Sequence, residues 1–184
     1  MKDSIAFLLS FANQPDKVGS MLPSSPFLAK AIAQVAKEYG HQQTIVEIGA
    51  GTGSLTSFIK RISEPTSVVA FEQNAHLAKR LIRNHPDVKV YDKSVPCREM
   101  NQLAQAGCVI VSSIPFRSLE REEHSMMATA MQELLRKNER NALIQYTYFP
   151  RQPFSLQGDS LKWRRRRLIL ANVPPAFIWT LAKA

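Results

Sequence analysis

Short apolar runs rich in β-branched residues alternate along most of the chain with longer segments whose apolar residues recur every three or four positions. The short runs are typical of buried strands, and the longer segments are typical of amphipathic helices. The first pattern predicts strands at 44–48, 67–71, 88–91, 108–112 and 142–149. The second pattern predicts helices at 54–62, 74–84, 97–105 and 119–138. This alternation indicates βα units around a sheet with five parallel strands.

The two ends of the chain depart from that alternation. Residues 1–39 form a predicted N-terminal helical segment with one helix at 4–13 and another at 27–39, whose apolar face carries Leu28, Ile32 and Val35. At the other end, strand-like runs at 163–172 and 176–181 are separated by only three residues. Because three residues cannot hold a crossover helix, we expect an antiparallel hairpin. The sequence thus predicts one α/β domain over 40–184, with a mostly parallel seven-stranded sheet that ends in this hairpin.

Composition narrows the class of protein. Hydrophobic residues make up 45% and charged residues 21% of the 184 residues, which is ordinary globular usage. Cys97 and Cys108 lack the partners that a disulfide framework or a zinc site would need, so we expect no metal and a reducing cytoplasm. The apolar run at 5–9 is too short to span a bilayer. A signal peptide is the competing interpretation, but Asp3 and the lack of an A-x-A cleavage site disfavour it.

The net charge of +9 is concentrated near the C-terminus. Residues 150–184 hold seven Lys or Arg and one acid, which leaves a net charge of +6 there and +3 in the rest of the chain. Such an excess suits an anionic partner. Charge alone does not decide between nucleic acid and an acidic lipid surface.

A glycine-rich turn follows the first predicted strand. Gly49, Gly51 and Gly53 have the spacing G-x-G-x-G, and Glu47 stands two residues before the first of them. Glycine lets a strand turn sharply into a helix and lets a ligand lie against the backbone. A pyrophosphate-binding turn usually has G-x-G-x-x-G spacing instead. The acidic Glu47 favours a cationic ligand that carries an amino acid moiety.

This E-x-G-x-G-x-G string resembles the first motif of class I S-adenosylmethionine-dependent methyltransferases, which have a Rossmann-like fold. Glu72 ends the second predicted strand, 19 residues after Gly53, and Asp92 ends the third. In that family the first acid accepts the ribose hydroxyls and the second contacts the adenine amine. The resemblance implies that S-adenosylmethionine is bound by Glu47, Gly49, Ala50, Gly51, Gly53, Glu72, Gln73, Asp92 and Ser112. The alternative is that these acids are merely solvated loop residues.

The fourth predicted strand runs into Ser112-Ser113-Ile114-Pro115-Phe116. Amino-group methyltransferases carry an N-x-P-[FY] type motif at this place. Methyl transfer mainly requires that a nitrogen lone pair is held about 3 Å from the methyl carbon. An amide, a hydroxyl or a backbone carbonyl can accept the hydrogens of the amine and aim that lone pair. Ser113 stands where adenine-methylating enzymes have Asn or Asp, which puts a nucleobase acceptor in doubt.

The chain is similar over nearly its whole length to short bacterial phospholipid N-methyltransferases, which convert phosphatidylethanolamine stepwise to phosphatidylcholine. The likeness is carried by segments 13–25, 113–115, 145–150 and 172–176. It implies a catalytic role for Ser113 and Tyr148. It also implies that the substrate contacts Ser24, Ser25, Ile114, Pro115 and Phe116.

The expected partners are therefore a phospholipid substrate and an anionic membrane surface, with the protein cytoplasmic and peripheral at the inner membrane. The helix at 4–13 either lies in the membrane interface as a lid or packs on the sheet. The run 164–167 is either a solvated strand edge or a binding stripe. A ribosomal RNA adenine dimethylase is the second interpretation, and a binding protein without turnover is the third. The four histidines have no evident partner in the sequence, and oligomeric state is left open.

Overall fold

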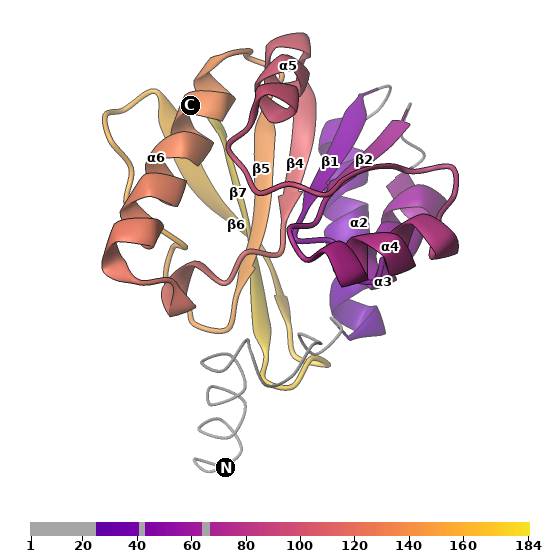
Figure 1. Ribbon diagram of the computed structural model, residues 1–184. Helices are drawn as coiled ribbons and strands as arrows, with labels where there is room; N and C mark the ends of the chain where they lie inside the picture. Colours follow the sequence, from indigo (N-terminus) through magenta and orange to yellow (C-terminus); the bar gives the residue numbers. More distant parts are fainter. Residues whose placement is uncertain (1–24, 41–42, 64–66) are drawn as a thin grey trace.

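The computed structural model describes residues 25–40, 43–63 and 67–184. A single seven-stranded sheet has helices on both faces (Figure 1). Its strands are β1 (Thr44–Ile48), β2 (Ser67–Phe71), β3 (Lys89–Tyr91), β4 (Cys108–Ser112), β5 (Ala142–Thr147), β6 (Leu161–Ile169) and β7 (Ala176–Lys183). The helices are α2 (Pro26–Gly40), α3 (Ser54–Phe58), α4 (Ala75–Asn84), α5 (Arg98–Ala106) and α6 (Arg121–Arg136). Two short turns of other helix types, η1 (Ile59–Ser63) and η2 (Phe116–Ser118), complete the elements.

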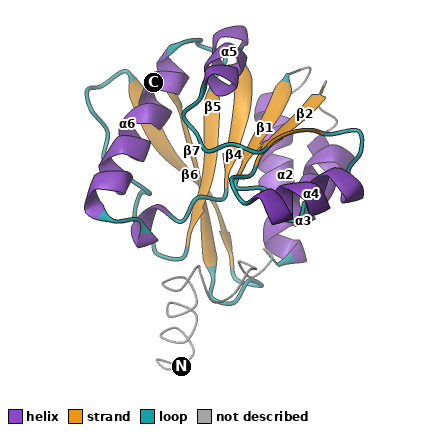
Figure 2. Ribbon diagram, in the orientation of Figure 1, coloured by secondary structure: helices purple, strands orange, loops and turns teal. Residues whose placement is uncertain are grey.

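The strand order is β3-β2-β1-β4-β5-β7-β6. The first five strands in that order pair in parallel, and β7 lies antiparallel between β5 and β6. The predicted fold class, the five parallel strands and the terminal hairpin are confirmed. Figure 2 shows the alternation of strand and helix that the apolar pattern indicated.

Each face of the sheet buries its own apolar cluster. On one face α2, α3 and α4 pack on the strands, with Leu28, Ile32 and Leu81 fully buried. On the other face α5 and α6 do the same, with Met100 and Met131 fully buried. Because both faces are covered, the central strands read as continuous apolar runs and not as alternating ones.

Several element boundaries differ from the sequence prediction. The helix expected at 54–62 changes from α to π geometry at Ile59. The strand expected at 142–149 ends at Thr147, and the strand expected at 163–172 runs from Leu161 to Ile169. The helix expected at 119–138 begins at Arg121, after the separate turn η2. The expected helix at 4–13 lies outside the described residues.

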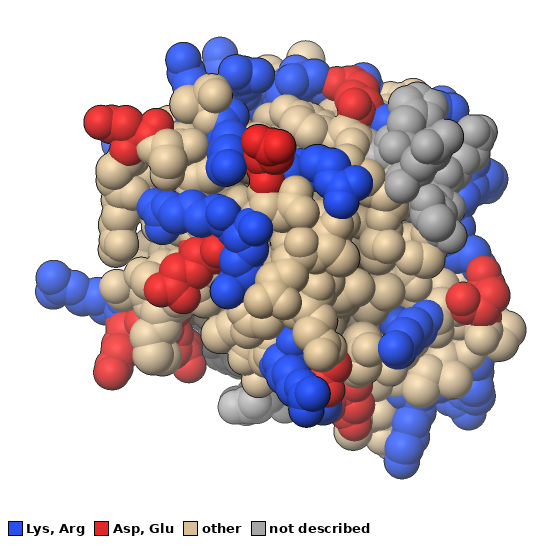
Figure 3. Space-filling model, turned by 90° about the horizontal axis from the view of Figure 1, so that it is seen from above, with Lys and Arg blue, Asp and Glu red and all other residues tan. Residues whose placement is uncertain are grey.

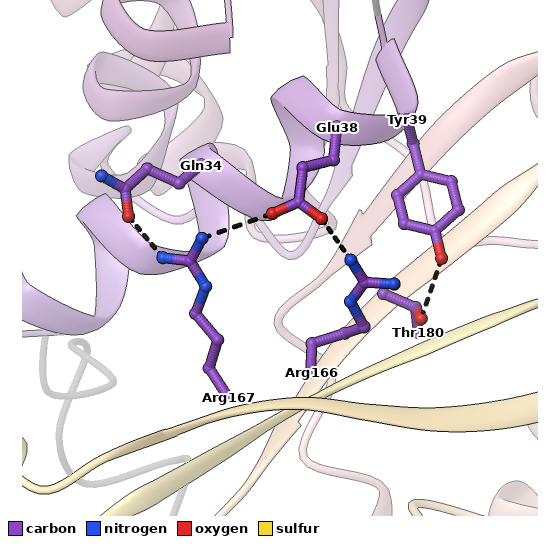
Figure 4. A network of polar contacts seen from close by, with 6 residues as sticks. All are labelled: Gln34, Glu38, Tyr39, Arg166, Arg167 and Thr180. Atoms are coloured by element: carbon purple, nitrogen blue, oxygen red, sulfur yellow. Dashed lines mark hydrogen bonds and ion pairs between the residues drawn. The ribbon is translucent and has the colours of Figure 1, made fainter.

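A polar network joins α2 to the edge strand β6 (Figure 4). Glu38 forms ion pairs with both Arg166 and Arg167, and Arg167 also donates to the Gln34 side chain. Neighbouring strand residues normally face opposite sides. A register shift between Arg165 and Arg167 lets the two arginines reach the same helix. Part of the run 164–167 is thus a contact within the molecule.

The edge of the sheet that carries the amino ends of the parallel strands is seen in Figure 3. Cationic and anionic side chains are interspersed over this view. Among the described residues there is no helix with the length and apolar character needed to cross a bilayer.

Candidate active site

The carboxyl ends of β1 and β4 meet where the strand order reverses, since the chain passes from β1 outward to β3 and then returns to β4. Open α/β sheets bind ligands at this switch point. The Ser113 backbone N–H donates to the Ile48 carbonyl over 2.9 Å. A Cβ placed on Gly49 would lie 3.7 Å from the Ser113 Cβ. The structure therefore brings the predicted cofactor turn and the predicted acceptor loop into contact.

The glycine turn is fastened to β2 by Glu72. One carboxylate oxygen of Glu72 accepts the Gly51 N–H over 2.8 Å, and the other accepts the Asn74 N–H over 2.8 Å. Each oxygen keeps a second lone pair, so the carboxylate can still accept hydroxyl donors. Gly51 has a φ of 58°, and a Cβ there would meet no atom within 4 Å. The turn therefore leaves open space on the side where a ligand would approach.

Two residues at the C-terminal end of α4 contact the same turn through their side chains. The Asn84 side chain donates to the Thr52 carbonyl over 3.0 Å, and His85 Nε2 lies 3.1 Å from the Gly53 carbonyl oxygen. A Cβ on Gly53 would lie 2.5 Å from the His85 ring, so only glycine fits there. The expectation that the histidines have no partner is wrong for His85. Sequence reasoning missed both residues because they contact the turn only through tertiary packing.

Glu47 is buried behind the glycine turn. Thr56 Oγ1 donates to one carboxylate oxygen over 2.6 Å, and the other oxygen has no partner among the described residues. Burial, opposed by the Thr56 hydrogen bond and reinforced by the nearby Glu72 charge, raises the pKa of Glu47 to about 8. A buried carboxyl with an open acceptor position suits a cationic donor.

The acceptor loop after β4 is held by side chains from two strands. Ser112 Oγ accepts the Ile114 N–H over 3.2 Å. The Ile114 carbonyl accepts two donors, Gln145 Nε2 at 3.0 Å and the Phe116 N–H at 2.9 Å, so its two lone pairs are filled. The Ser113 hydroxyl makes no hydrogen bond to another described residue. Gln145 Oε1 is likewise buried without a partner among the described residues.

Five further predicted site residues differ in how exposed they are. Asp92, Gln73 and Pro115 are exposed at the carboxyl edge, while Ile114 is half-buried and Ala50 is buried in the glycine turn. Their ligand contacts remain predictions.

Two predicted substrate residues have structural partners instead. Phe116 is buried, and its ring packs 4.8 Å from that of Phe154. The Ser25 hydroxyl accepts the Leu28 N–H over 3.2 Å at the start of α2, as a helix cap does. Ser24 lies outside the described residues. A sequence motif does not show which way a side chain points. Neither the packing of Phe116 nor the helix cap at Ser25 could therefore be predicted from it.

Tyr148 follows β5 directly and lies at the exposed edge, with its ring 5.8 Å from that of Tyr146. Partial burial, together with Tyr146, raises the pKa of the Tyr148 hydroxyl above its usual range. The phenol is protonated at neutral pH, and its hydrogen bond with the Tyr146 side chain favours that protonated form.

Comparison with known proteins adds a family to this geometry. The family model for ribosomal RNA adenine dimethylase matches residues 16–177. The chain belongs to the ribosomal RNA adenine dimethylase family. It is also 28% identical over 131 residues to the ornithine lipid N-methyltransferase of Singulisphaera acidiphila, a match that covers 66% of this chain and 67% of that protein.

Solved structures with the same fold include the 23S rRNA methyltransferase ErmE, with a TM-score of 0.54 and 17% identity over 85% of this chain and 67% of that one. The plantazolicin methyltransferase BpumL in complex with SAH has a TM-score of 0.58 and 8% identity, and covers 97% of this chain and 90% of that one. These likenesses extend over most of the chain.

The family member described here is an S-adenosylmethionine-dependent N-methyltransferase. The residues present fit that cofactor on two structural observations. The open space beside Gly51 is where a side chain would intrude on a bound ligand. The unpartnered oxygen of Glu47 would accept a hydrogen bond from a positively charged donor group that displaces the proton held by this carboxyl at neutral pH.

Proposed function

We propose that this chain methylates the amine of ethanolamine phospholipids at a membrane surface. One observation carries the proposal: the acceptor loop places a short hydroxyl, Ser113, against Gly49 where the resemblance to adenine-methylating enzymes would require an amide or acid. The match to a lipid N-methyltransferase supports the same substrate class.

S-adenosylmethionine supplies the methyl group, and the residues of the chain position the two reactants. We propose that Glu72 and the glycine turn hold the cofactor, and that Asp92 and Gln73 contact its adenosine part. The Ser113 hydroxyl and Gln145 Oε1 are the buried acceptors open at the loop, because the Ile114 carbonyl is already filled. They would accept hydrogens of the neutral amine and aim its lone pair. Tyr148 would exchange its hydrogen bond with Tyr146 for one to the headgroup phosphate.

Ribosomal RNA is the second candidate substrate. The family model and the net charge of +9 favour it. An adenine acceptor would have to be unstacked and inserted next to Ser113. The two candidates are separated by product analysis, because one product partitions into organic solvent and the other does not.

The test offers labelled S-adenosylmethionine together with phosphatidylethanolamine vesicles and ribosomal RNA, in separate and in mixed reactions. We expect label in the lipid phase, in the methylated ethanolamine headgroup. Label in RNA alone would overturn the proposal and would establish the nucleic-acid substrate.

Gly51→Asp provides the inactive control, because an Asp side chain would enter the space beside the turn. Gly158→Asp is its matched control, since Gly158 also has a positive φ, of 77°, and open space at its Cβ position. Both variants place a side chain at a position with positive φ and add the same charge. We expect only Gly51→Asp to lose cofactor binding. Equal loss in both variants would show that strain, and not the ligand, explains the effect.

A further inference from the structure

The turn between β6 and β7 projects beyond the other described elements (Figure 1). Leu170 is 72% exposed and Val173 is 81% exposed. Residues 170–175 contain no charged side chain. A single exposed apolar residue is ordinary, but this turn carries two large ones at the tip of a projecting hairpin.

A hydrogen bond within the turn stabilises its conformation. Asn172 is buried, and its side chain donates to the Pro174 carbonyl over 2.7 Å. The inward Asn172 leaves its neighbours Ala171 and Val173 exposed. Apolar side chains are thus presented to the outside by a turn with its own internal hydrogen bond.

Strand register places this turn beside the acceptor site. Ser112 pairs with Gln145, Gln145 with Trp179, and Trp179 with Arg165, so these residues form one row across the sheet. Thr147, Phe177 and Leu168 form a row two residues closer to the edge. At 3.3–3.4 Å per residue, that second row lies about 7 Å beyond the acceptor row. The turn projects farther still, on the same side as the acceptor loop.

Cationic side chains stand behind the apolar tip. The Arg165 guanidinium lies 6.0 Å from the centre of the Phe177 ring, and that of Arg117 lies 5.1 Å from the centre of the Phe149 ring. Neither arginine forms an ion pair with a described carboxylate, whereas Arg166 and Arg167 are held by Glu38. An apolar tip with arginines set back from it matches the order of acyl chains and anionic headgroups in a bilayer.

We propose that the β6–β7 turn inserts into the surface of a bilayer that contains anionic phospholipid, with Arg165 and Arg117 at the level of the headgroups. This inference rests on the proposed lipid substrate and gives that substrate its route: a headgroup reaches Ser113 without leaving the membrane.

The test measures co-sedimentation of the full chain with vesicles of phosphatidylethanolamine, with and without phosphatidylglycerol. We expect Leu170→Glu and Val173→Glu each to weaken binding about tenfold or more, because a carboxylate at the tip must enter the apolar layer. Ile82→Glu is the matched control, with the same change at a side chain that is 49% exposed on α4. Arg165→Gln should weaken binding only to the anionic vesicles and flatten its salt dependence. Binding of both tip variants equal to wild type overturns the proposal.

A Val173→Trp variant reports insertion directly. The native Trp163 and Trp179 are buried, so bilayer quenchers should act on the new indole alone. Brominated lipid should quench its fluorescence. A tip indole that is already shielded without vesicles would show that another part of the chain or a second copy covers the turn, which would also overturn the proposal.

Activity on detergent-dispersed phosphatidylethanolamine separates this inference from the proposed function. If the tip variants lose activity on vesicles but keep it on dispersed lipid, both proposals stand. If wild type methylates dispersed lipid while the tip variants bind vesicles normally, the substrate stands and the insertion fails. If wild type methylates no lipid in either form, the proposed function fails, and the route for a headgroup fails with it.

Discussion

The buried carboxyl of Glu47 makes the stability of the fold depend on pH. Its pKa is about 8 in the folded protein, against 4.5 for an unperturbed glutamate. Between these values the folded state holds a proton that the unfolded state has released. This residue therefore makes the free energy of unfolding fall as pH rises through that window. Its effect is absent below pH 4.5, where both states are protonated.

Glu47→Gln should remove that pH dependence. In urea unfolding of the protein without cofactor, we expect the difference in unfolding free energy between wild type and variant to change by a few kcal/mol, on the order of 1.4 kcal/mol per pKa unit. Wild type should lose stability relative to the variant as the pH rises. Two curves that stay parallel across the window would show that Glu47 is not buried as described.

Ser113 can be tested as a group that orients the acceptor. Ser113→Ala should lower kcat by about 10- to 100-fold and change cofactor affinity little, because the proposed role of the hydroxyl is to orient the amine and not to bind the cofactor. Ser118→Ala, in the exposed turn η2 of the same loop, is the control. Single-turnover rates and cofactor titration give the two quantities. A parallel loss of cofactor affinity would indicate instead that Ser113 supports the glycine turn.

At the residue scale the sequence was most informative where a motif follows a strand. Glu72 and the glycine turn were placed correctly next to each other, because the ends of neighbouring parallel strands must meet. The resemblance places Phe116 and Ser25 at the substrate, and the structure shows a further role for each, since Phe116 packs in the core and Ser25 caps α2. The support from His85 was invisible, because its contact with Gly53 joins residues that are 32 positions apart.

At the scale of elements, α2 is attached to the sheet in two ways. Its apolar face is buried, and its polar face holds Arg166 and Arg167 through Glu38 (Figure 4). The three charged side chains are all between 31% and 40% exposed. Ion pairs in such a setting contribute about 0–1 kcal/mol each. Apolar burial should therefore carry most of the attachment.

Glu38→Gln should cost about 1 kcal/mol or less, and the loss should shrink further at high salt. Ile32→Ala, at a fully buried position in the same helix, should cost about 2–5 kcal/mol at any salt concentration. Urea unfolding at low and high ionic strength measures both. If Glu38→Gln proved the more costly change, the network and not the core would anchor the helix.

The sequence predicted the type of every described strand and long helix, but not where each ends. Apolar periodicity indicates which residues are buried. A strand buries its side chains only as far as the neighbouring elements extend along it. Tyr148 and Phe149 continue the apolar run of β5, yet they lie past the last paired residue, Thr147. The register shift in β6 was also unforeseen, because four identical arginines contain no signal for which of them is the extra residue.

At the scale of the whole molecule, the strand order divides the proposed cofactor and acceptor sites between two halves of the sheet. β1 and β2 carry the glycine turn and Glu72, while β4 and β5 carry Ser113 and Gln145. The two halves meet between β1 and β4, where the Ser113 N–H is bonded to Ile48. Because β1 and β4 pair in parallel from Thr44 to Ile48, and the Ser113 N–H extends that ladder, the sheet itself holds the glycine turn and the acceptor loop at a fixed separation.

The arginine run on β6 affects how this edge of the sheet can associate with other molecules. In the described sheet β6 has a partner, β7, on one side only. A strand of another molecule can add to an edge of this kind through backbone hydrogen bonds. Residues 164–167 place four arginines along it, of which Arg166 and Arg167 are paired with Glu38, and a register shift interrupts the run. Two such edges would bring Arg164 and Arg165 of both copies together, neither of which has an ion pair with a described carboxylate, and their irregular registers would not match, so pairing of one β6 edge with another is disfavoured.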